Sequence, residues 1–114
     1  MHVSVPQLDP VEVMPGFAGR FVHAERTTLA FWDLPAGREL PAHSHPHEQI
    51  LVQQSGRFEI TVDGETWIAE AGDCVVIPPN VEHSGRSLTD CRILDVFAPV
   101  REDYREACVA AGQG

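Results

Sequence analysis

The sequence of 114 residues lacks several features that would place it in other classes of protein. It has no apolar run of about 18 residues, so we expect no membrane-spanning helix, and its excess of acidic residues argues against a membrane partner. Its N-terminus lacks a basic stretch followed by an apolar one, so we expect no secretory signal and a cytoplasmic location. The length is that of one domain with a single core.

Basic residues and cysteines are also few. Eight basic residues against 17 acidic ones give a formal net charge of −9. Because this balance offers no basic footprint, we expect no nucleic acid partner, and an anionic small molecule would need local positive charge from an arginine or a metal. The three cysteines, Cys74, Cys91 and Cys108, form no C-x-x-C pair, which argues against a disulfide framework or a thiolate zinc site. We interpret Cys74 and Cys91 as small buried apolar residues.

Turn-forming residues recur at short intervals, and the runs between them are rich in Val, Ile, Phe, Thr and Trp. This rhythm predicts an all-β sandwich or barrel. Residues 58–62 alternate apolar and polar side chains, and the Asp-Gly pair that follows predicts a tight hairpin turn. Three segments are nearly continuous in apolar character, so we expect both of their faces to be buried: 28–34, 74–77 and 92–97.

We expect the chain to form a single domain over residues 1–114. Residues 1–16 would form an N-terminal arm, residues 17–100 the barrel, and residues 101–114 a C-terminal helix and tail. The helix itself is expected over residues 102–111. It is short and has few large apolar side chains, so we expect it at the surface with a frayed end.

Histidines are concentrated in one segment, where three of the six fall within residues 43–47. On an extended strand, His43 and His45 would point to the same face, and Gln49 has the same parity. His83 follows a Pro-Pro-Asn turn, and antiparallel strands could bring it beside His45. The sequence therefore predicts a site for one divalent metal ion, held by His43, His45, Gln49 and His83. Such donors suit Ni, Fe, Zn, Mn or Co, and they do not suit calcium.

The pattern of the histidine segment leaves alternatives open. Histidine-rich patches also occur on exposed loops without any function. Glu48 would replace Gln49 as a ligand if the strand register shifted by one residue. His47 would either contact the metal ligands without binding the ion itself or face outward, and we favour the outward orientation.

Asp95 interrupts an apolar run and shares one strand face with Ile93 and Phe97. If both faces are covered, its carboxyl group is buried, and its raised pKa would suit a proton donor or acceptor, although a nearby metal would lower that pKa. Alternatively, Asp95 faces water or pairs with Arg92 or Arg101. Phe97 suits the core, and Arg101 is either a surface residue or a clamp for a substrate carboxylate at a cavity mouth.

Two motifs resemble those of the cupin superfamily. The first is Gly37, His43, His45, Gln49 and Gly56, and the second is Gly72, Pro78, Asn80 and His83. This resemblance implies a double-stranded β-helix, also called a jelly-roll barrel. Gln49 departs from the usual acidic ligand, and Asn80 replaces a glycine but also tolerates positive φ. A neutral Gln49 would leave the site charge at +2, which favours Lewis-acid chemistry over oxygen activation.

The sequence His-x-His-Pro-His-Glu-Gln resembles a narrower group, the KdgF-like small cupins, which linearise cyclic unsaturated uronates. That group places Asp, Phe and Arg after the second motif, at the spacing of Asp95, Phe97 and Arg101. The resemblance implies a metal-dependent enzyme that opens the ring of a sugar acid, or tautomerises a related hydroxy-carbonyl compound. Asp95 and Arg101 would be catalytic, with Asp95 as general acid and base. Phe97 and Arg101 would bind substrate, the arginine through a carboxylate.

Other functions remain open within the same superfamily. One is a metal-dependent dioxygenase. Another is a sulfoniopropionate lyase, which we favour less because the only tyrosine, Tyr104, lies in the tail. The last is a binding module that holds a small molecule without turnover. By resemblance to other small cupins, and because outer strands need cover, we expect a homodimer.

Overall fold

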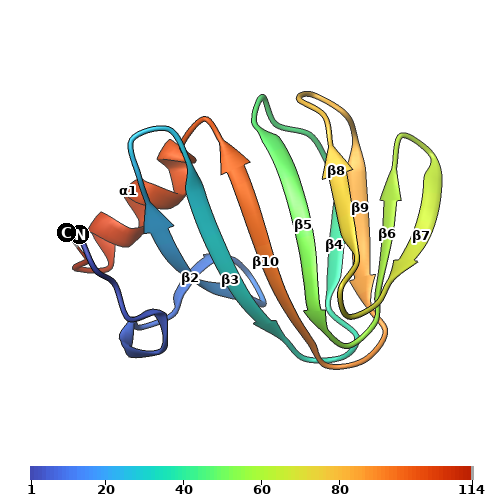
Figure 1. Ribbon diagram of the computed structural model, residues 1–114, viewed down its shortest axis with the longest axis horizontal. Coiled ribbons are helices and arrows are strands. Elements are labelled where there is room, and N and C mark those ends of the chain that lie inside the picture. The colour runs from blue at the N-terminus through green and yellow to red at the C-terminus, as the bar shows by residue number, and fades with distance from the viewer. Residues whose placement is uncertain (114) are drawn as a thin grey trace.

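The computed structural model describes residues 1–113 and consists of two antiparallel β-sheets that face each other, with one α-helix at the C-terminus (Figure 1). The strands are β1 (Val11–Met14), β2 (Phe17–His23), β3 (Thr28–Leu34), β4 (Glu39–His43), β5 (Glu48–Ser55), β6 (Phe58–Val62), β7 (Glu65–Ala69), β8 (Cys74–Ile77), β9 (His83–Ser87) and β10 (Cys91–Ala98). A short 3-10 helix, η1 (Val5–Gln7), precedes them, and α1 (Glu102–Ala110) follows.

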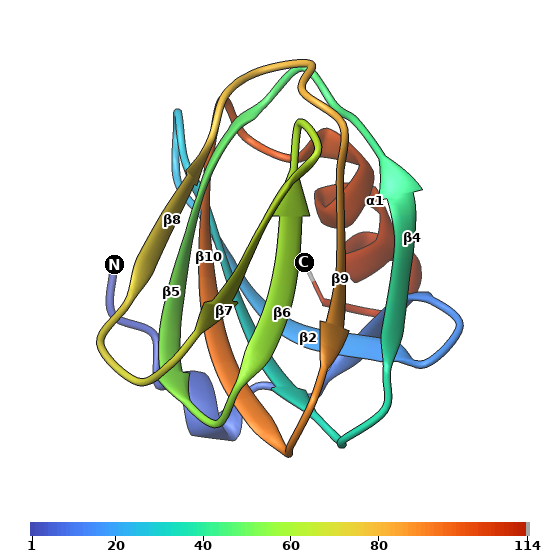
Figure 2. The ribbon, with the colours of Figure 1, turned by 90° about the vertical axis from the view of Figure 1, so that its right-hand side faces the viewer.

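The two sheets have the strand order of a jelly-roll barrel. One contains six strands in the order β1-β2-β3-β10-β5-β8, and the other four in the order β4-β9-β6-β7 (Figure 2). The expected all-β fold with a short C-terminal helix is therefore confirmed. β1 precedes residue 17, where we expected the barrel to begin. Neither helix within residues 1–113 has the length and apolar character needed to cross a membrane.

The core lies between the sheets and follows from the alternation of side chains along each strand. In β6, Phe58, Ile60 and Val62 are buried and the residues between them are half-buried. The following Asp63 and Gly64 have φ of 50° and 79°, as the predicted hairpin turn requires. The turn thus sets the register that returns β7 beside β6.

The expectation that residues 74–77 are buried on both faces is wrong. β8 is an edge strand of the six-stranded sheet, and its outward side chains have no covering layer among the described residues. Cys74 is exposed, contrary to its interpretation as a buried residue, and Val76 is 60% exposed. Cys91 is buried, as predicted.

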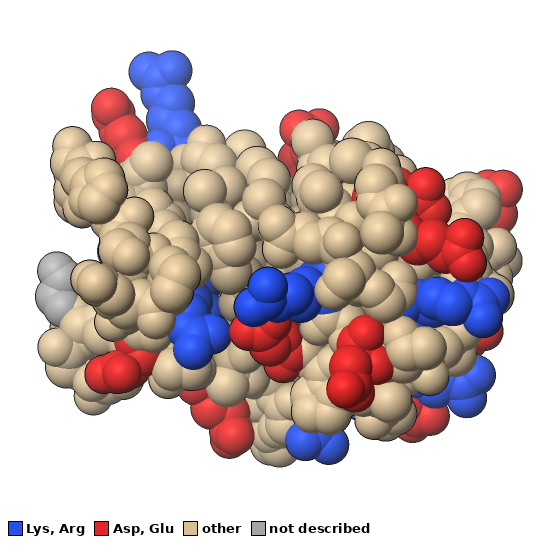
Figure 3. All heavy atoms as spheres, turned by 60° about the horizontal axis from the view of Figure 1, so that its bottom comes forward, with Lys and Arg blue, Asp and Glu red and all other residues tan. Residues whose placement is uncertain are grey.

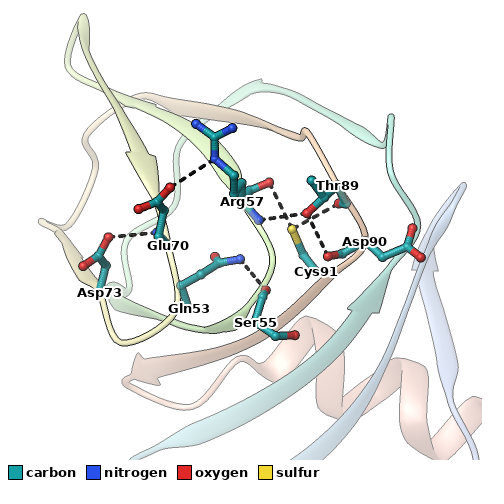
Figure 4. A network of polar contacts seen from close by, with 8 residues as sticks. All are labelled: Gln53, Ser55, Arg57, Glu70, Asp73, Thr89, Asp90 and Cys91. Atoms are coloured by element: carbon teal, nitrogen blue, oxygen red, sulfur yellow. Dashed lines mark hydrogen bonds and ion pairs between the residues drawn. The ribbon is translucent and has the colours of Figure 1, made fainter.

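A network of polar contacts closes the end of the barrel away from His83 (Figure 4). Arg57 pairs with Glu70 at 3.1 Å, and its backbone N–H donates to the Thr89 hydroxyl at 2.9 Å. Gly56 has φ of +78°, and a Cβ atom there would collide with the carbonyl oxygen of Asp90. This position therefore requires glycine both for its dihedral angles and for the close approach of the two loops.

Helix α1 covers one side of the barrel. It packs against β1 and β2, with Tyr104 and Cys108 buried on one face. The rings of Tyr104 and Phe21 lie 5.0 Å apart. The helix ends at Ala110, one residue earlier than expected, and its packing is more extensive than the surface position we expected.

Charged side chains of both signs are interspersed on the face shown in Figure 3, with no extended basic area. Several arginines form ion pairs with neighbouring acidic residues. Arg20 and Arg92 both pair with Asp33, at 3.4 and 3.0 Å, and Arg86 pairs with Glu59 at 3.8 Å. Each of these three arginines therefore has an acidic partner, and Arg20 and Arg92 share one carboxylate.

Candidate metal centre

Three histidines converge at one end of the barrel. His43 ends β4 and His83 begins β9, and these two residues are register partners in the four-stranded sheet. One nitrogen from each of His43, His45 and His83 lies within 4.8 Å of the others. The predicted convergence of His83 with the histidine segment is therefore present.

His45 reaches this cluster by a route that differs from the parity argument. β4 ends at His43, so His45 lies in the connection to β5 rather than on a strand. The backbone N–H of Asn80 donates to the His45 carbonyl oxygen at 2.8 Å. Asn80 has φ of 63°, in the left-handed region that asparagine tolerates. The Pro-Pro-Asn turn thus holds His45 in place and also leads into His83.

All three rings are held through the same nitrogen. The Nδ1 atoms of His43, His45 and His83 lie 2.9, 3.0 and 2.9 Å from the carbonyl oxygens of residues 41, 47 and 81. A carbonyl only accepts, so Nδ1 carries the proton and Nε2 keeps its lone pair. The Nε2 atom of His83 is buried and has no hydrogen-bond partner among the described residues. This arrangement is the one that metal-binding histidines require.

Gln49 adds a fourth donor from β5. Its side chain is buried, and Oε1 lies 3.1 Å from Nε2 of His45. With the proton of His45 on Nδ1, two lone pairs face each other at this distance. A cation between them would turn this contact from unfavourable to favourable, since cis ligands at about 2.1 Å from one ion lie about 3 Å apart.

The protonation of the histidines also suits a metal. Burial lowers the pKa of His83 to about 4, with smaller contributions from the charges of His43, His45 and Arg101. Burial, followed by the charge of Arg101, lowers the pKa of His45 as well. The two rings are neutral at pH 7, which is the form that binds metal. The residues present therefore fit a metal ion, and the cluster of His43, His45 and His83 could hold one.

Glu48 and His47, the chain neighbours of Gln49, do not contribute to the cluster of candidate metal ligands. Glu48 is exposed and Gln49 is buried, so the shifted register that would make Glu48 a ligand is not the one present. His47 is half-buried rather than directed outward, and its ring lies 5.5 Å from that of His45 and 6.4 Å from that of Phe97. Our preferred orientation for His47 is therefore wrong, because the ring packs against the rings of the site.

Asp95 lies on the inward face of β10, beside the cluster. It is 8% exposed, and its Oδ2 accepts a hydrogen bond of 3.0 Å from Nε1 of Trp32. Oδ1 is buried and has no hydrogen-bond partner within residues 1–113. Burial raises the pKa of Asp95 to about 6, against the smaller lowering effects of Gln49, Trp32 and Arg101. The predicted burial and raised pKa are both present, and the alternatives of an exposed or Arg92-paired Asp95 are wrong.

Arg101 is more enclosed than expected of a residue at a barrel rim. It is 8% exposed, and its Nε and Nη2 atoms donate to the carboxylate of Asp103 at 3.0 and 2.8 Å. Its guanidinium carbon lies 4.7 Å from the ring centre of Phe97 and 3.9 Å from that of Tyr104. Phe97 is 2% exposed and its ring lies 5.6 Å from that of His45. The arginine fork expected for a substrate carboxylate is thus occupied by Asp103.

Two residues of the site were missed in the sequence. Tyr104 lies in helix α1, in the segment expected to form the tail, and lines the same cavity as the histidines. Burial raises its pKa to about 12, so it stays protonated and can donate a hydrogen bond but is a poor base. The spacing of Tyr104 and Cys108 on one helix face was a signal for its burial. Trp32 gave no signal, because only the register of β3 against β10 places it near Asp95.

One cavity joins these groups. Its free volume is about 50 Å³, and it is lined by His43, His45, His83, Gln49, Asp95, Arg101 and Tyr104. Candidate metal ligands, a buried carboxyl group and an arginine paired with Asp103 thus line one cavity. Such a combination in one cavity is typical of an active site.

Comparisons with known proteins agree with this architecture. The chain is 36% identical to the pectin degradation protein KdgF of Dickeya dadantii over 64 residues, which span 54% of this chain and 58% of that protein. It therefore spans less than two thirds of the length of this relative. It is 33% identical to L-ectoine synthase of Shouchella clausii over 55 residues, 48% of this chain and 41% of that enzyme. Relatives of the chain thus include enzymes.

A solved structure gives wider coverage. The structure of KdgF from Halomonas sp. superimposes with a TM-score of 0.81 at 27% sequence identity, over 87% of this chain and 93% of that one. The cupin domain family matches residues 30–97, from β3 to the inward Phe97 of β10. The chain is therefore a small cupin that resembles KdgF, and it belongs to the cupin domain family.

Proposed function

We propose that this cupin is a metal-dependent enzyme that opens the ring of a sugar acid, such as an unsaturated uronate, or tautomerises a related hydroxy-carbonyl compound. The observation that carries this proposal is the position of Asp95. A buried carboxyl group with a free oxygen lines the same cavity as three converging histidines. Similarity to KdgF supports the reaction class.

In this proposal His43, His45, Gln49 and His83 hold one divalent ion. The ion, when bound, supplies Lewis-acid polarisation of substrate oxygens. Asp95 then moves the proton. In ring opening, its Oδ1 takes the proton of the anomeric hydroxyl and returns it to the ring oxygen as the carbonyl forms and the ring C–O bond breaks. Burial, which raises the pKa of Asp95 in the metal-free protein, supports its role in both transfers.

Neighbouring side chains support that proton transfer. Trp32 holds Oδ2 of Asp95, so Oδ1 is the oxygen available to substrate. Arg101 supplies positive charge to an otherwise acidic protein, and Asp103 and Tyr104 fix its position. Phe97 shapes the cavity between His45 and Arg101. Glutamine in place of an acidic ligand favours this chemistry over oxygen activation.

The test begins with elemental analysis of the purified protein, followed by a turnover screen on unsaturated uronates. We expect about one divalent ion per chain and loss of uronate absorbance. Asp95→Asn should lose turnover by about 100-fold or more while keeping its metal, whereas Glu48→Gln, which changes an exposed acid next to the site, should keep both. Full metal loading without turnover of any uronate would refute the sugar-acid reaction. Oxygen uptake would instead favour a dioxygenase.

A further inference from the structure

The guanidinium group of Arg101 is enclosed on both faces and along one edge. Its carbon atom lies between the rings of Phe97 and Tyr104, 4.7 and 3.9 Å from their centres. Asp103 occupies the edge formed by Nε and Nη2, through the two hydrogen bonds described above. A guanidinium has five N–H groups, so three remain, and they belong to the edge formed by Nη1 and Nη2. Since Arg101 lines the cavity, this second edge is the part of the group that is left for a ligand.

The backbone of Arg101 is held separately, by Thr28 at the start of β3. Thr28 is 0% exposed and is the register partner of Phe97. Its hydroxyl oxygen accepts the N–H of Arg101 at 3.0 Å and lies 2.9 Å from Nδ1 of His23. Burial, followed by the charge of Arg105, lowers the pKa of His23, so its neutral ring can accept the hydroxyl proton. The threonine hydroxyl is thus oriented to accept from Arg101.

The position of Asp103 favours a fixed ion pair over a movable one. Asp103 is the second residue of α1, where the chain enters the helix after β10 (Figure 1), and the helix dipole stabilises an acidic side chain there. The Arg101 side chain is only 9% exposed, although that of Asp103 is 59% exposed. The cavity has a free volume of about 50 Å³, room for a few water molecules, so the guanidinium has little space to turn inward.

We propose, resting on the function proposed above, that Thr28 and Asp103 are positioning residues for Arg101. This supporting pair holds the arginine at its backbone and at one edge, so that the edge formed by Nη1 and Nη2 receives the substrate carboxylate. Two parallel N–H groups match a carboxylate, and an arginine already held in place loses less freedom on binding. Neither Thr28 nor Asp103 lines the cavity, so both act through Arg101.

Substitution of Asp103 tests whether it helps the substrate or competes with it. In the metal-loaded protein turning over an unsaturated uronate, Asp103→Asn should raise KM about tenfold and leave kcat within about twofold, because an interaction shared by the ground and transition states is weakened. Glu102→Gln is the matched control, since this neighbouring acid pairs with Arg105 at 3.7 Å, and it should keep the parent KM. An unchanged or lower KM in Asp103→Asn would overturn the proposal.

Two substitutions of Thr28 separate its hydroxyl from its shape. Thr28→Val keeps the shape without the hydroxyl and should raise KM by about threefold or more, whereas Thr28→Ser keeps the hydroxyl and should keep the parent KM. Equal KM values in these two variants would overturn the role of Thr28. In an Arg101→Lys background, Asp103→Asn and Thr28→Val should each change KM by less than about twofold, because the group that they position is gone. Full effects in that background would show that they do not act through Arg101.

Hydrogen exchange of the Arg101 Nε–H group tests the supporting pair without any substrate. Its NMR signal is identified by its loss in Arg101→Lys. Exchange with water should be at least about tenfold faster in Asp103→Asn than in the parent, and unchanged in Glu102→Gln. Equal exchange in the parent and Asp103→Asn would overturn the proposal. Turnover of no uronate by the parent, together with faster exchange in Asp103→Asn, would refute the proposed function and still support the positioning of Arg101 by Asp103.

Discussion

Replacing Asp95 by asparagine should change how the stability of the metal-free protein depends on pH. Burial raises the pKa of Asp95 to about 6 in the folded protein, from the ordinary 3.8. A difference of about two in pKa corresponds to about 3 kcal/mol. The unfolded chain loses this proton first as pH rises, while the folded protein retains it. The stability contributed by protonated Asp95 is therefore complete below pH 3.8 and is lost as pH rises through about 6.

The assay is urea unfolding of both proteins in a chelator, at unit steps from pH 4 to pH 8. We expect the free energy of unfolding of Asp95→Asn, relative to the parent, to rise by about 2–3 kcal/mol across this range. His45 and His83, whose lowered pKa values act in the opposite direction, contribute equally to both proteins and cancel in the difference. Glu65→Gln, an exposed position on β7, controls for the loss of one charge. A difference that stays constant within about 0.5 kcal/mol would refute the burial argument.

Three further predictions concern the metal, a loop and the outer strands. His83→Ala should lose the bound metal measured by elemental analysis, whereas His2→Ala, at an exposed position outside the cluster, should retain it. Gly56→Ala should lower the free energy of unfolding by about 2–4 kcal/mol in denaturant titration, because its Cβ would meet a backbone oxygen. Gly37→Ala, also at positive φ but with open space around it, should lower it by only about 1–2 kcal/mol. Equal losses in the two variants would contradict the steric argument. We expect a homodimer in light scattering, and Val76→Asp should weaken it if the exposed face of β8 is the interface.

The fold could be predicted from the sequence because local signals agreed with one another. Alternating side chains in residues 58–62, the hairpin turn at Asp63 and the spacing of the two motifs all specify strands and their neighbours. What failed was burial on the outer faces. The apolar run at residues 74–77 resembles a central strand, and only the sheet order shows that it is an edge. Apolar character alone does not distinguish a covered strand from one that lies exposed on the barrel.

The metal ligands were predicted for a reason that was only partly correct. Strand parity applies to His43, but His45 lies beyond the end of β4, and a hydrogen bond from Asn80 fixes it. Asp95 was found because a carboxyl group in an apolar run is unusual. The partners of the site, Trp32 and Asp103, escaped prediction. Trp32 needs the register of β3, and the fork between Arg101 and Asp103 forms where the chain enters α1.

The buried polar groups of the cavity cost stability in the metal-free protein, and this cost supports a functional role for them. Asp95 has an unpartnered oxygen, His83 an unpartnered nitrogen, and Gln49 directs an oxygen toward a nitrogen lone pair of His45, within the described part of the chain. An apolar residue at any of these positions would fit the surrounding core without such a penalty. One cation would satisfy the histidine and glutamine atoms together, and a substrate proton would satisfy Asp95. These unsatisfied atoms are therefore the ones that the proposed metal-dependent proton transfer would use.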